Sequence, residues 1–305
     1  MPFLIFVALL VVSLATALLA RRAALRLRDE TIARLPLGAN GIIPGAEGFE
    51  LRRGPKAPAA LLLHGAGDTP QTLRYLAEFL FARGFTVSAP LLPGHGRSLR
   101  EFSAVDAESW LGEAHRAYAE LKSSSPWVGL VGLSMGGALA ARLAAEVSEL
   151  PALVLLAPYL AMPPRIAFAA RISKFWNPAV PYVRAIDPKE RRSILDRAEA
   201  ARSLGYGVFT PAALRALHTT VSAAVAALPR ITSPTLMVQS REDNRVPPEA
   251  AQREFDRIGS ADKQLVWLTG TGHVITVDYG RERVFDLVAN WLERHRAALS
   301  RERRA

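Results

Sequence analysis

A serine stands between glycines directly after a strongly apolar stretch of the chain. Gly132, Ser134 and Gly136 form a G-x-S-x-G pattern, with the apolar run 127–133 before it and an Ala-rich helical pattern after it. A serine on such a tight strand-to-helix turn exposes its hydroxyl, and the glycines remove side chains that would collide where strand and helix approach. The pattern therefore predicts a nucleophilic serine that forms a covalent intermediate.

A serine hydroxyl needs a base to take its proton and an acid to orient that base. At serines of this type the chain order is serine, then an acidic residue, then histidine. Asp243 follows the apolar run 235–239, and His273 lies on a Gly-rich loop after the apolar run 264–268. Both residues should therefore lie at the carboxyl ends of strands, where Ser134 also lies.

Two other acidic residues compete for the orienting role. Glu242 adjoins Asp243 and is the alternative, although its side chain should point elsewhere from the same loop. Asp278 follows His273 too closely and does not fit the chain order. Asp243 is therefore the preferred acid.

The negative oxygen that develops during acyl transfer needs two backbone N–H donors. Met135 should supply one, since it directly follows the serine. Ala66 should supply the other from the loop after the first core strand, which also contains His64 and Gly65. We expect His64 to hydrogen-bond locally and shape this loop, and we expect residues 94–96 to shape a second turn at the same edge.

Short apolar runs alternate with helical patterns from residue 59 onward. Continuously apolar runs rich in branched residues are typical of parallel strands that are covered on both faces. The alternation predicts a doubly wound, mostly parallel α/β sheet with right-handed crossovers. The predicted core strands are Ala59–Leu63, Phe85–Ala89, Trp127–Leu133, Ala152–Leu156, Thr235–Gln239 and Gln264–Leu268.

One connection is much longer than the others. It contains a well-marked helix, with Thr210 as N-cap and Pro211 in the first turn. Connections of this length are usually lids or subdomains. We therefore expect residues 159–230 to form a helical cap over the edge of the sheet where ligands bind. Its aromatic residues, expected either to suit an acyl chain or to form the cap's own core, are Phe168, Phe175, Trp176 and Tyr182.

The N-terminal segment is apolar on every side. Residues 3–20 carry no charge over 18 positions, and a helix of that length would cover about 27 Å, close to the hydrocarbon thickness of a bilayer. Arginines follow from Arg21, and flanking basic residues favour the cytoplasmic side. We expect a transmembrane anchor over residues 1–22, a basic juxtamembrane linker over 23–48 and the remainder in the cytosol. An exported or outward-facing protein is the alternative.

Composition narrows the remaining possibilities. The chain has no cysteine, which excludes a disulfide scaffold, a thiolate zinc site and a cysteine nucleophile. The net charge of +10 is concentrated at the ends of the chain and accompanies no nucleic-acid-binding motif, so we expect no nucleic-acid partner. No metal-ligand cluster, dinucleotide-binding pattern or phosphate-binding loop occurs, and no cofactor or metal is implied. The sequence leaves the oligomeric state open.

Taken together, the motifs resemble a known superfamily. LLLHGAG, PLLPGHGRS, GLSMGG, SREDNRVP and GHVITVD occur in this order, with the long insertion before SREDNRVP. The chain resembles the α/β-hydrolases, and most closely the bacterial monoacylglycerol lipases and small carboxylesterases of the serine-aminopeptidase-like branch. The resemblance implies Ser134 as nucleophile, Asp243 as acid and His273 as base. It also implies oxyanion-binding N–H groups from Ala66 and Met135.

These observations lead to one expected organisation and activity. An α/β-hydrolase core over residues 49–158 and 231–300 would carry the cap over 159–230 and be preceded by the transmembrane helix. We expect hydrolysis of carboxylic esters, either monoacylglycerol or other short-to-medium acyl esters, through an acyl-enzyme. A thioesterase, peptidase or other hydrolase on the same three residues is the alternative, and a non-catalytic, hydrolase-like binding protein is a further one.

Overall fold

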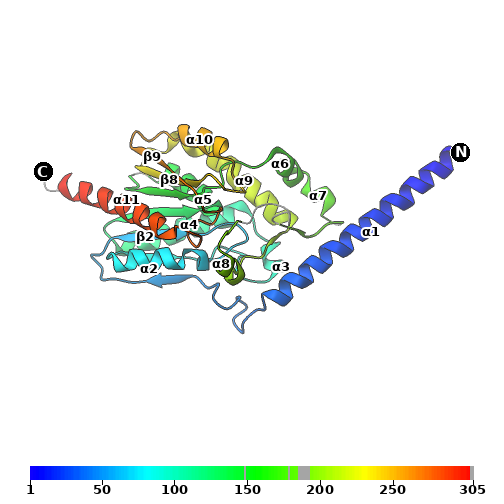
Figure 1. Ribbon diagram of the computed structural model, residues 1–305, viewed down its shortest axis with the longest axis horizontal. Coiled ribbons are helices and arrows are strands. Elements are labelled where there is room, and N and C mark those ends of the chain that lie inside the picture. Colours follow the sequence, from blue (N-terminus) through cyan, green and yellow to red (C-terminus); the bar gives the residue numbers. More distant parts are fainter. Residues whose placement is uncertain (148, 178, 185–192, 303–305) are drawn as a thin grey trace.

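The protein consists of a helix-covered sheet and one long helix that projects from it (Figure 1). The computed structural model describes residues 1–147, 149–177, 179–184 and 193–302. The N-terminus lies at the far end of the projecting helix, and the C-terminal helix ends on the opposite side of the molecule.

The centre of the fold is a seven-stranded sheet with the order β1-β3-β2-β4-β5-β8-β9. The edge strand β1 is antiparallel to β3, and all other neighbours pair in parallel. The predicted mostly parallel sheet is therefore confirmed. The strands are β1 (Phe49–Leu51), β2 (Ala59–Leu63), β3 (Thr86–Ala89), β4 (Val128–Leu133), β5 (Leu153–Leu156), β8 (Thr235–Ser240) and β9 (Lys263–Leu268).

Both faces of the sheet are covered, because side chains alternate across each strand. On β2, Leu61 and Leu63 belong to one hydrophobic core and Ala60 and Leu62 to the other. The helices α4 (Ala107–Ser124), α5 (Met135–Glu146) and α10 (Pro248–Asp256) cover the first face. The helices α2 (Arg74–Ala82) and α11 (Arg281–Glu302) cover the second. Full burial of β2, β4 and β5 explains their continuously apolar sequences.

Over its described residues, the long connection between β5 and β8 contains four α-helices, one strand pair and the short 3-10 helix η2 (Leu228–Arg230). Its elements are α6 (Pro164–Arg171), α7 (Ser173–Trp176), β6 (Val183–Arg184), α8 (Arg197–Arg202), β7 (Val208–Phe209) and α9 (Pro211–Ala227). The cap is therefore not purely helical, since β6 and β7 pair in antiparallel fashion. Strands of two residues leave no periodic pattern in a sequence. The boundaries of the core and cap domains stay predictions.

The N-terminal helix α1 runs without a break over Pro2–Arg34. The first part of the segment expected as a linker is thus helical. Among the described residues, the stretch Leu4–Arg34 is long and apolar enough to cross a membrane, and a signal sequence meets the same criteria. Its apolar part is exposed, whereas Ala24, Leu27 and Thr31 are buried at the spacing of one helix face.

The end of α1 is fastened to the cap. The Arg34 guanidinium donates hydrogen bonds to the carbonyls of Gly205 and Tyr206, at 2.6 and 2.9 Å. Glu30 forms an ion pair with Arg184 of β6 at 3.3 Å. The helix therefore meets the body at the cap, next to the β6–β7 pair.

The predicted N-cap of helix α9 can be tested directly by mutation. The Thr210 hydroxyl accepts a hydrogen bond from the Ala213 N–H at 3.2 Å and caps the helix. We expect Thr210→Ala to lower the free energy of unfolding by about 1–2 kcal/mol, because a buried cap is lost. Thr219→Ala, at an exposed position of the same helix, should change it by no more than a few tenths of a kcal/mol. Urea denaturation measures the free energy of unfolding of both variants. Equal changes in the two variants would contradict the assignment of Thr210 as the N-cap.

Candidate active site

Ser134 occupies a sharp turn between β4 and α5. Its backbone has φ +55° and ψ −118°, in a region that non-glycine residues rarely adopt. The Ser134 N–H donates to the Leu156 carbonyl at 2.9 Å, and the Ser134 carbonyl accepts from the Tyr159 N–H at 3.0 Å. A Cβ at Gly132 would collide with the Gly136 backbone across the turn, and a Cβ at Gly136 would collide with the backbone of Leu63 and His64 at the end of β2. The predicted tight turn is therefore present, and it is held against the neighbouring strand β5.

A chain of hydrogen bonds joins Ser134 to His273 and His273 to Asp243. The Ser134 Oγ lies 2.8 Å from His273 Nε2, and His273 Nδ1 lies 2.8 Å from Asp243 Oδ2. An ionised carboxylate can only accept, so Nδ1 carries the proton and Nε2 accepts the serine hydroxyl. The structure thus brings together the three residues that the sequence had singled out, in the tautomer that proton abstraction needs.

The Asp243 carboxylate is fully enclosed and fully hydrogen-bonded. Besides His273, its oxygens accept from Gln239 Nε2 at 2.7 Å and from the N–H groups of Arg245 and Val246 at 2.7 and 3.0 Å. Burial raises the pKa of Asp243. The charge of His273 and these hydrogen bonds outweigh that effect and hold the pKa below its ordinary value. Asp243 is therefore an anion that can orient and stabilise a charged imidazole.

The two competing acidic residues have other roles. Glu242 accepts a hydrogen bond from the Ser240 hydroxyl at 3.3 Å, whereas Asp243 is the carboxylate that lies against His273 Nδ1. Asp278 is buried, and its carboxylate accepts from the N–H groups of Gly272 at 2.7 Å and of Leu195 at 2.8 Å. Asp278 therefore fixes the loop that carries His273 and ties this loop to the cap. No local sequence pattern marks this positioning role of Asp278.

The expected oxyanion loop passes directly beside the serine. A Cβ at Gly65 would lie 3.3 Å from Ser134 Cβ, so the chain there can approach closely because it lacks a side chain. Ala66 is the next residue, and Met135 begins α5. The first N–H groups of a helix have no partner within the helix and carry its positive dipole end. The two backbone segments thus flank the serine hydroxyl.

His64 shapes this loop, as the sequence suggested. Its Nδ1 lies 2.9 Å from the Gly65 carbonyl, and its Nε2 accepts from the Leu92 N–H at 3.1 Å. Burial and the neighbouring His95 lower the pKa of His64 well below its ordinary value, so the ring is neutral. His64 therefore links the loop after β2 to Leu92 by a hydrogen bond and to the turn at residues 94–96 by ring contact with His95.

Comparison with known proteins places the chain in a family. A model of the serine aminopeptidase S33 family matches residues 54–279, which is most of the chain. The chain belongs to this family. It is 29% identical over 260 residues to a thermostable monoacylglycerol lipase of Bacillus sp. strain H-257, covering 83% of this chain and 97% of that protein. It is also 29% identical over 248 residues to a carboxylesterase of Bacillus subtilis strain 168, covering 81% and 96%.

Solved structures agree with this assignment. The structure reported for LipS and LipT, two metagenome-derived lipolytic enzymes, matches with a TM-score of 0.72 and 30% identity, covering 83% of this chain and all of that one. The fold is the α/β-hydrolase fold, and the chain is a serine hydrolase of the lipase and esterase family. Residues 1–53 lie outside the family match.

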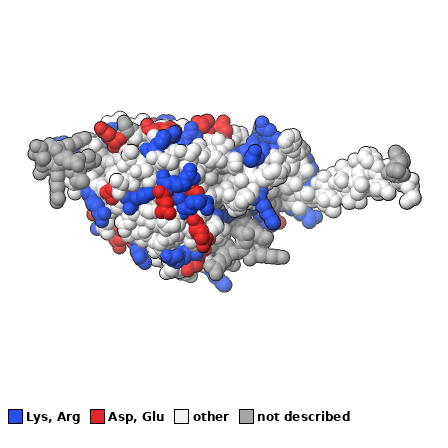
Figure 2. All heavy atoms as spheres, turned by 90° about the horizontal axis from the view of Figure 1, so that it is seen from above, with Lys and Arg blue, Asp and Glu red and all other residues white. Residues whose placement is uncertain are grey.

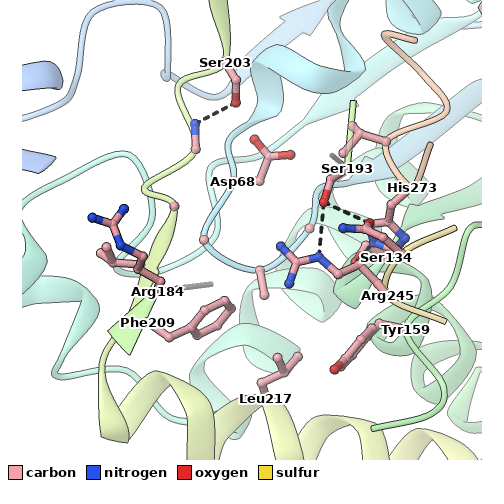
Figure 3. A pocket seen from close by; sticks show the side chains of 18 of the residues that line it. Asp68, Ser134, Tyr159, Arg184, Ser193, Ser203, Phe209, Leu217, Arg245 and His273 are labelled. Atoms are coloured by element: carbon pink, nitrogen blue, oxygen red, sulfur yellow. Dashed lines mark hydrogen bonds between the residues drawn. The ribbon is translucent and has the colours of Figure 1, made fainter. Parts of the chain in front are cut away.

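A cavity of about 670 Å³ opens above Ser134 (Figure 3). This volume is in the range of small-molecule sites. Part of its wall is apolar and comes from the cap, and part is polar. The apolar cap residues that line the cavity include Ile166, Val183, Phe209, Leu214 and Leu217.

The aromatic residues singled out in the cap are absent from this wall. Phe168 and Phe175 are exposed at the surface, and neither lines the cavity. Trp176 Nε1 donates to the Ala169 carbonyl at 2.9 Å within the cap, and Tyr182 packs against the core. The tyrosine and phenylalanine side chains that line the cavity are instead Tyr159, just after β5, and Phe209, on the strand β7 that the sequence did not reveal.

Asp68 is a carboxyl group in the cavity wall that sequence reasoning missed. It follows the oxyanion loop and lies beneath the cap segment that carries Ser203 (Figure 3). Its Oδ1 accepts from the Thr69 N–H at 2.8 Å. Burial raises the pKa of Asp68 from 3.8 to about 6, against the opposing effects of hydrogen bonds and of the nearby His273. The position of this acidic residue, in a loop at the ligand-binding edge of the sheet, was the sequence signal that could have identified it.

The raised pKa of Asp68 predicts a specific pH dependence of stability. Between pH 3.8 and about 6 the folded protein holds more protons at this group than the unfolded chain, so its contribution to stability falls as the pH rises. We expect Asp68→Asn to raise the free energy of unfolding by about 3 kcal/mol well above pH 6, and to leave it unchanged below pH 4. Urea denaturation across this range tests the claim. A difference that is constant with pH would contradict it.

Proposed function

We propose that this protein hydrolyses carboxylic esters by transferring the acyl group to Ser134. The observation that carries the proposal is the unbroken hydrogen-bond chain from the enclosed Asp243 through His273 to the Ser134 hydroxyl. Because this hydroxyl opens into the cavity, an ester carbonyl can reach it there. Membership of a serine hydrolase family supports the same chemistry.

The reaction follows from the tautomer. The Ser134 oxygen attacks the ester carbonyl carbon while its proton passes to His273 Nε2, and Asp243 stabilises the imidazolium that forms. The imidazolium then gives this proton to the leaving alcohol, the ester C–O bond breaks, and the acyl group stays on Ser134. A water molecule attacks the acyl-enzyme with His273 again as base, and Ser134 recovers its proton as the acid departs.

The backbone donors of the site stabilise the charge that develops on the carbonyl oxygen. We assign this role to the N–H groups of Met135 and Ala66, which flank Ser134 from α5 and from the loop after β2. Donors that are fixed before the reaction begins need no reorganisation, and removing one typically costs 10²–10³-fold in rate. The glycines Gly65, Gly132 and Gly136 support this role by allowing the close approach.

The substrates we propose are monoacylglycerol or other esters of short-to-medium acyl chains. The apolar cap side chains Ile166, Leu214 and Leu217 would contact the acyl chain, and Asp68 lies among the polar groups on the wall. Two relatives at 29% identity are named as a monoacylglycerol lipase and a carboxylesterase. A cavity that combines an apolar wall with polar groups suits an ester of this kind.

We further propose that α1 anchors the protein in a membrane. Its apolar residues 4–20 are exposed, which is unfavourable in water and favourable in a bilayer. The arginines that follow favour the cytoplasmic side for the catalytic domain. Arg34, at the end of this helix, lines the cavity and bonds to cap carbonyls, so the helix contributes to the folded domain. That contribution supports an anchor that is retained rather than a signal that is removed.

Hydrolysis of p-nitrophenyl esters of increasing chain length tests the proposed activity. We expect Ser134→Ala to reduce kcat/KM by about 10⁴-fold or more on every ester, since the nucleophile is lost. Ser222→Ala, at an exposed position on α9, should retain the rate of the unmodified protein. The rate should rise from acetate toward medium chain lengths. Equal rates for the Ser134 variant and the unmodified protein would exclude the mechanism.

A further inference from the structure

Two large aromatic side chains of the cap face solvent. Phe175 on α7 is 86% exposed and Phe168 on α6 is 62% exposed, and Ile166 beside them is 43% exposed. Isolated exposed apolar residues are common on proteins, but a group of them on adjoining elements marks an interaction site. Because neither phenylalanine lines the cavity, binding of the acyl chain does not account for their exposure.

Basic side chains surround these aromatic residues. Arg165, Arg171 and Lys174 are exposed on the same two helices, and residues 159–184 contain no aspartate or glutamate. Figure 2 shows Lys and Arg side chains at the shoulder from which the projecting helix leaves the body. Ile166, Phe168 and Phe175 with Arg165, Arg171 and Lys174 are together called the α6–α7 surface. It combines apolar groups with positive charge, and the stretch 159–184 to which its residues belong carries no acidic side chain.

The α6–α7 surface lies at the end of the molecule from which α1 departs (Figure 1). The last turns of α1 are fixed to the cap by the buried Leu27 and Thr31 and by the hydrogen bonds of Arg34. From residue 20 to residue 34 the helix rises by about 21 Å. A bilayer that holds the apolar part of α1 therefore faces this end of the body and not the opposite one.

We propose that the α6–α7 surface binds the interface of an anionic lipid bilayer. Phe168 and Phe175 enter the boundary between headgroups and acyl chains, and Arg165, Arg171 and Lys174 contact lipid phosphates. Aromatic residues with a basic border are the composition of helices that lie in a membrane interface, and each basic residue near an anionic surface adds about fivefold to binding. The inference rests on the membrane anchoring that we propose for α1.

This second attachment has a consequence for substrate entry. Ile166 belongs to both the α6–α7 surface and the wall of the cavity. Docking of this surface therefore places one wall of the cavity against the lipid. An amphiphilic ester could then move from the bilayer into the cavity along apolar side chains, without full exposure to water.

The test measures the depth of α7 in a bilayer and does not depend on catalysis. The full-length protein carrying Phe175→Trp is reconstituted into vesicles of equal parts phosphatidylcholine and phosphatidylglycerol, with or without brominated acyl chains. The fluorescence of the protein without this substitution is subtracted. Tyr279→Trp is the matched control, because Tyr279 is 55% exposed on the loop before α11. We expect bromine to quench the reporter at position 175 and not the control.

A second variant, in which the three basic residues are neutralised, tests how much their charge contributes to docking. Arg165→Gln, Arg171→Gln and Lys174→Gln together should lower the ratio of docked to undocked protein by about 100-fold, so that quenching at position 175 is lost. Quenching that persists in this variant would overturn the role of the basic residues. Absence of quenching in the protein with all three charges would overturn the proposal. So would a blue shift that grows with protein concentration without bromine quenching, because a second copy would then cover the surface. Hydrolysis of p-nitrophenyl butyrate, measured on the same samples, reports separately on the proposed enzymatic function.

Discussion

The backbone of Ser134 is the constraint on which the site depends. A non-glycine residue at φ +55° costs about 1–3 kcal/mol, and it persists only where its surroundings enforce it. Here the enforcement comes from the fully buried strands β4 and β5, through the bond to the Leu156 carbonyl and the bond from the Tyr159 N–H. The backbone at Gly132 and Gly136 is packed so closely that neither position has room for a Cβ. The parallel sheet therefore aims one hydroxyl at the edge where the loops with His273 and Asp243 also end.

At the same edge of the sheet, hydrogen bonds join the cap to the core. The Asp278 carboxylate joins the loop of His273 to the cap through the Leu195 N–H. On the other side, Arg34 joins α1 to the cap through the Gly205 and Tyr206 carbonyls and also lines the cavity. The cavity is thus bounded by the core, by the cap and by the end of the N-terminal helix. A displacement of α1 would therefore move Arg34 and change the shape of the cavity wall.

Much of this arrangement was predictable because its signals are local. The buried strands are continuous apolar runs, Thr210 and Pro211 mark the start of α9, and the positions of Asp243 and His273 follow from the chain order of such sites. The role of Asp278, the raised pKa of Asp68 and the β6–β7 pair depend on contacts between distant segments, which no local pattern encodes. For the same reason the sequence could not distinguish exposed aromatic residues of the cap, such as Phe175, from ones that line a cavity.

We propose that one serine hydroxyl in this chain, that of Ser134, is activated by the residues around it. Reaction with a fluorophosphonate probe, followed by peptide mass spectrometry, tests this claim most directly, because such probes label activated serines and leave ordinary ones unmodified. We expect a single adduct on the peptide that contains Ser134, and its loss in the His273→Ala protein. An adduct on a different serine, or labelling of Ser134 that does not require His273, would contradict the account.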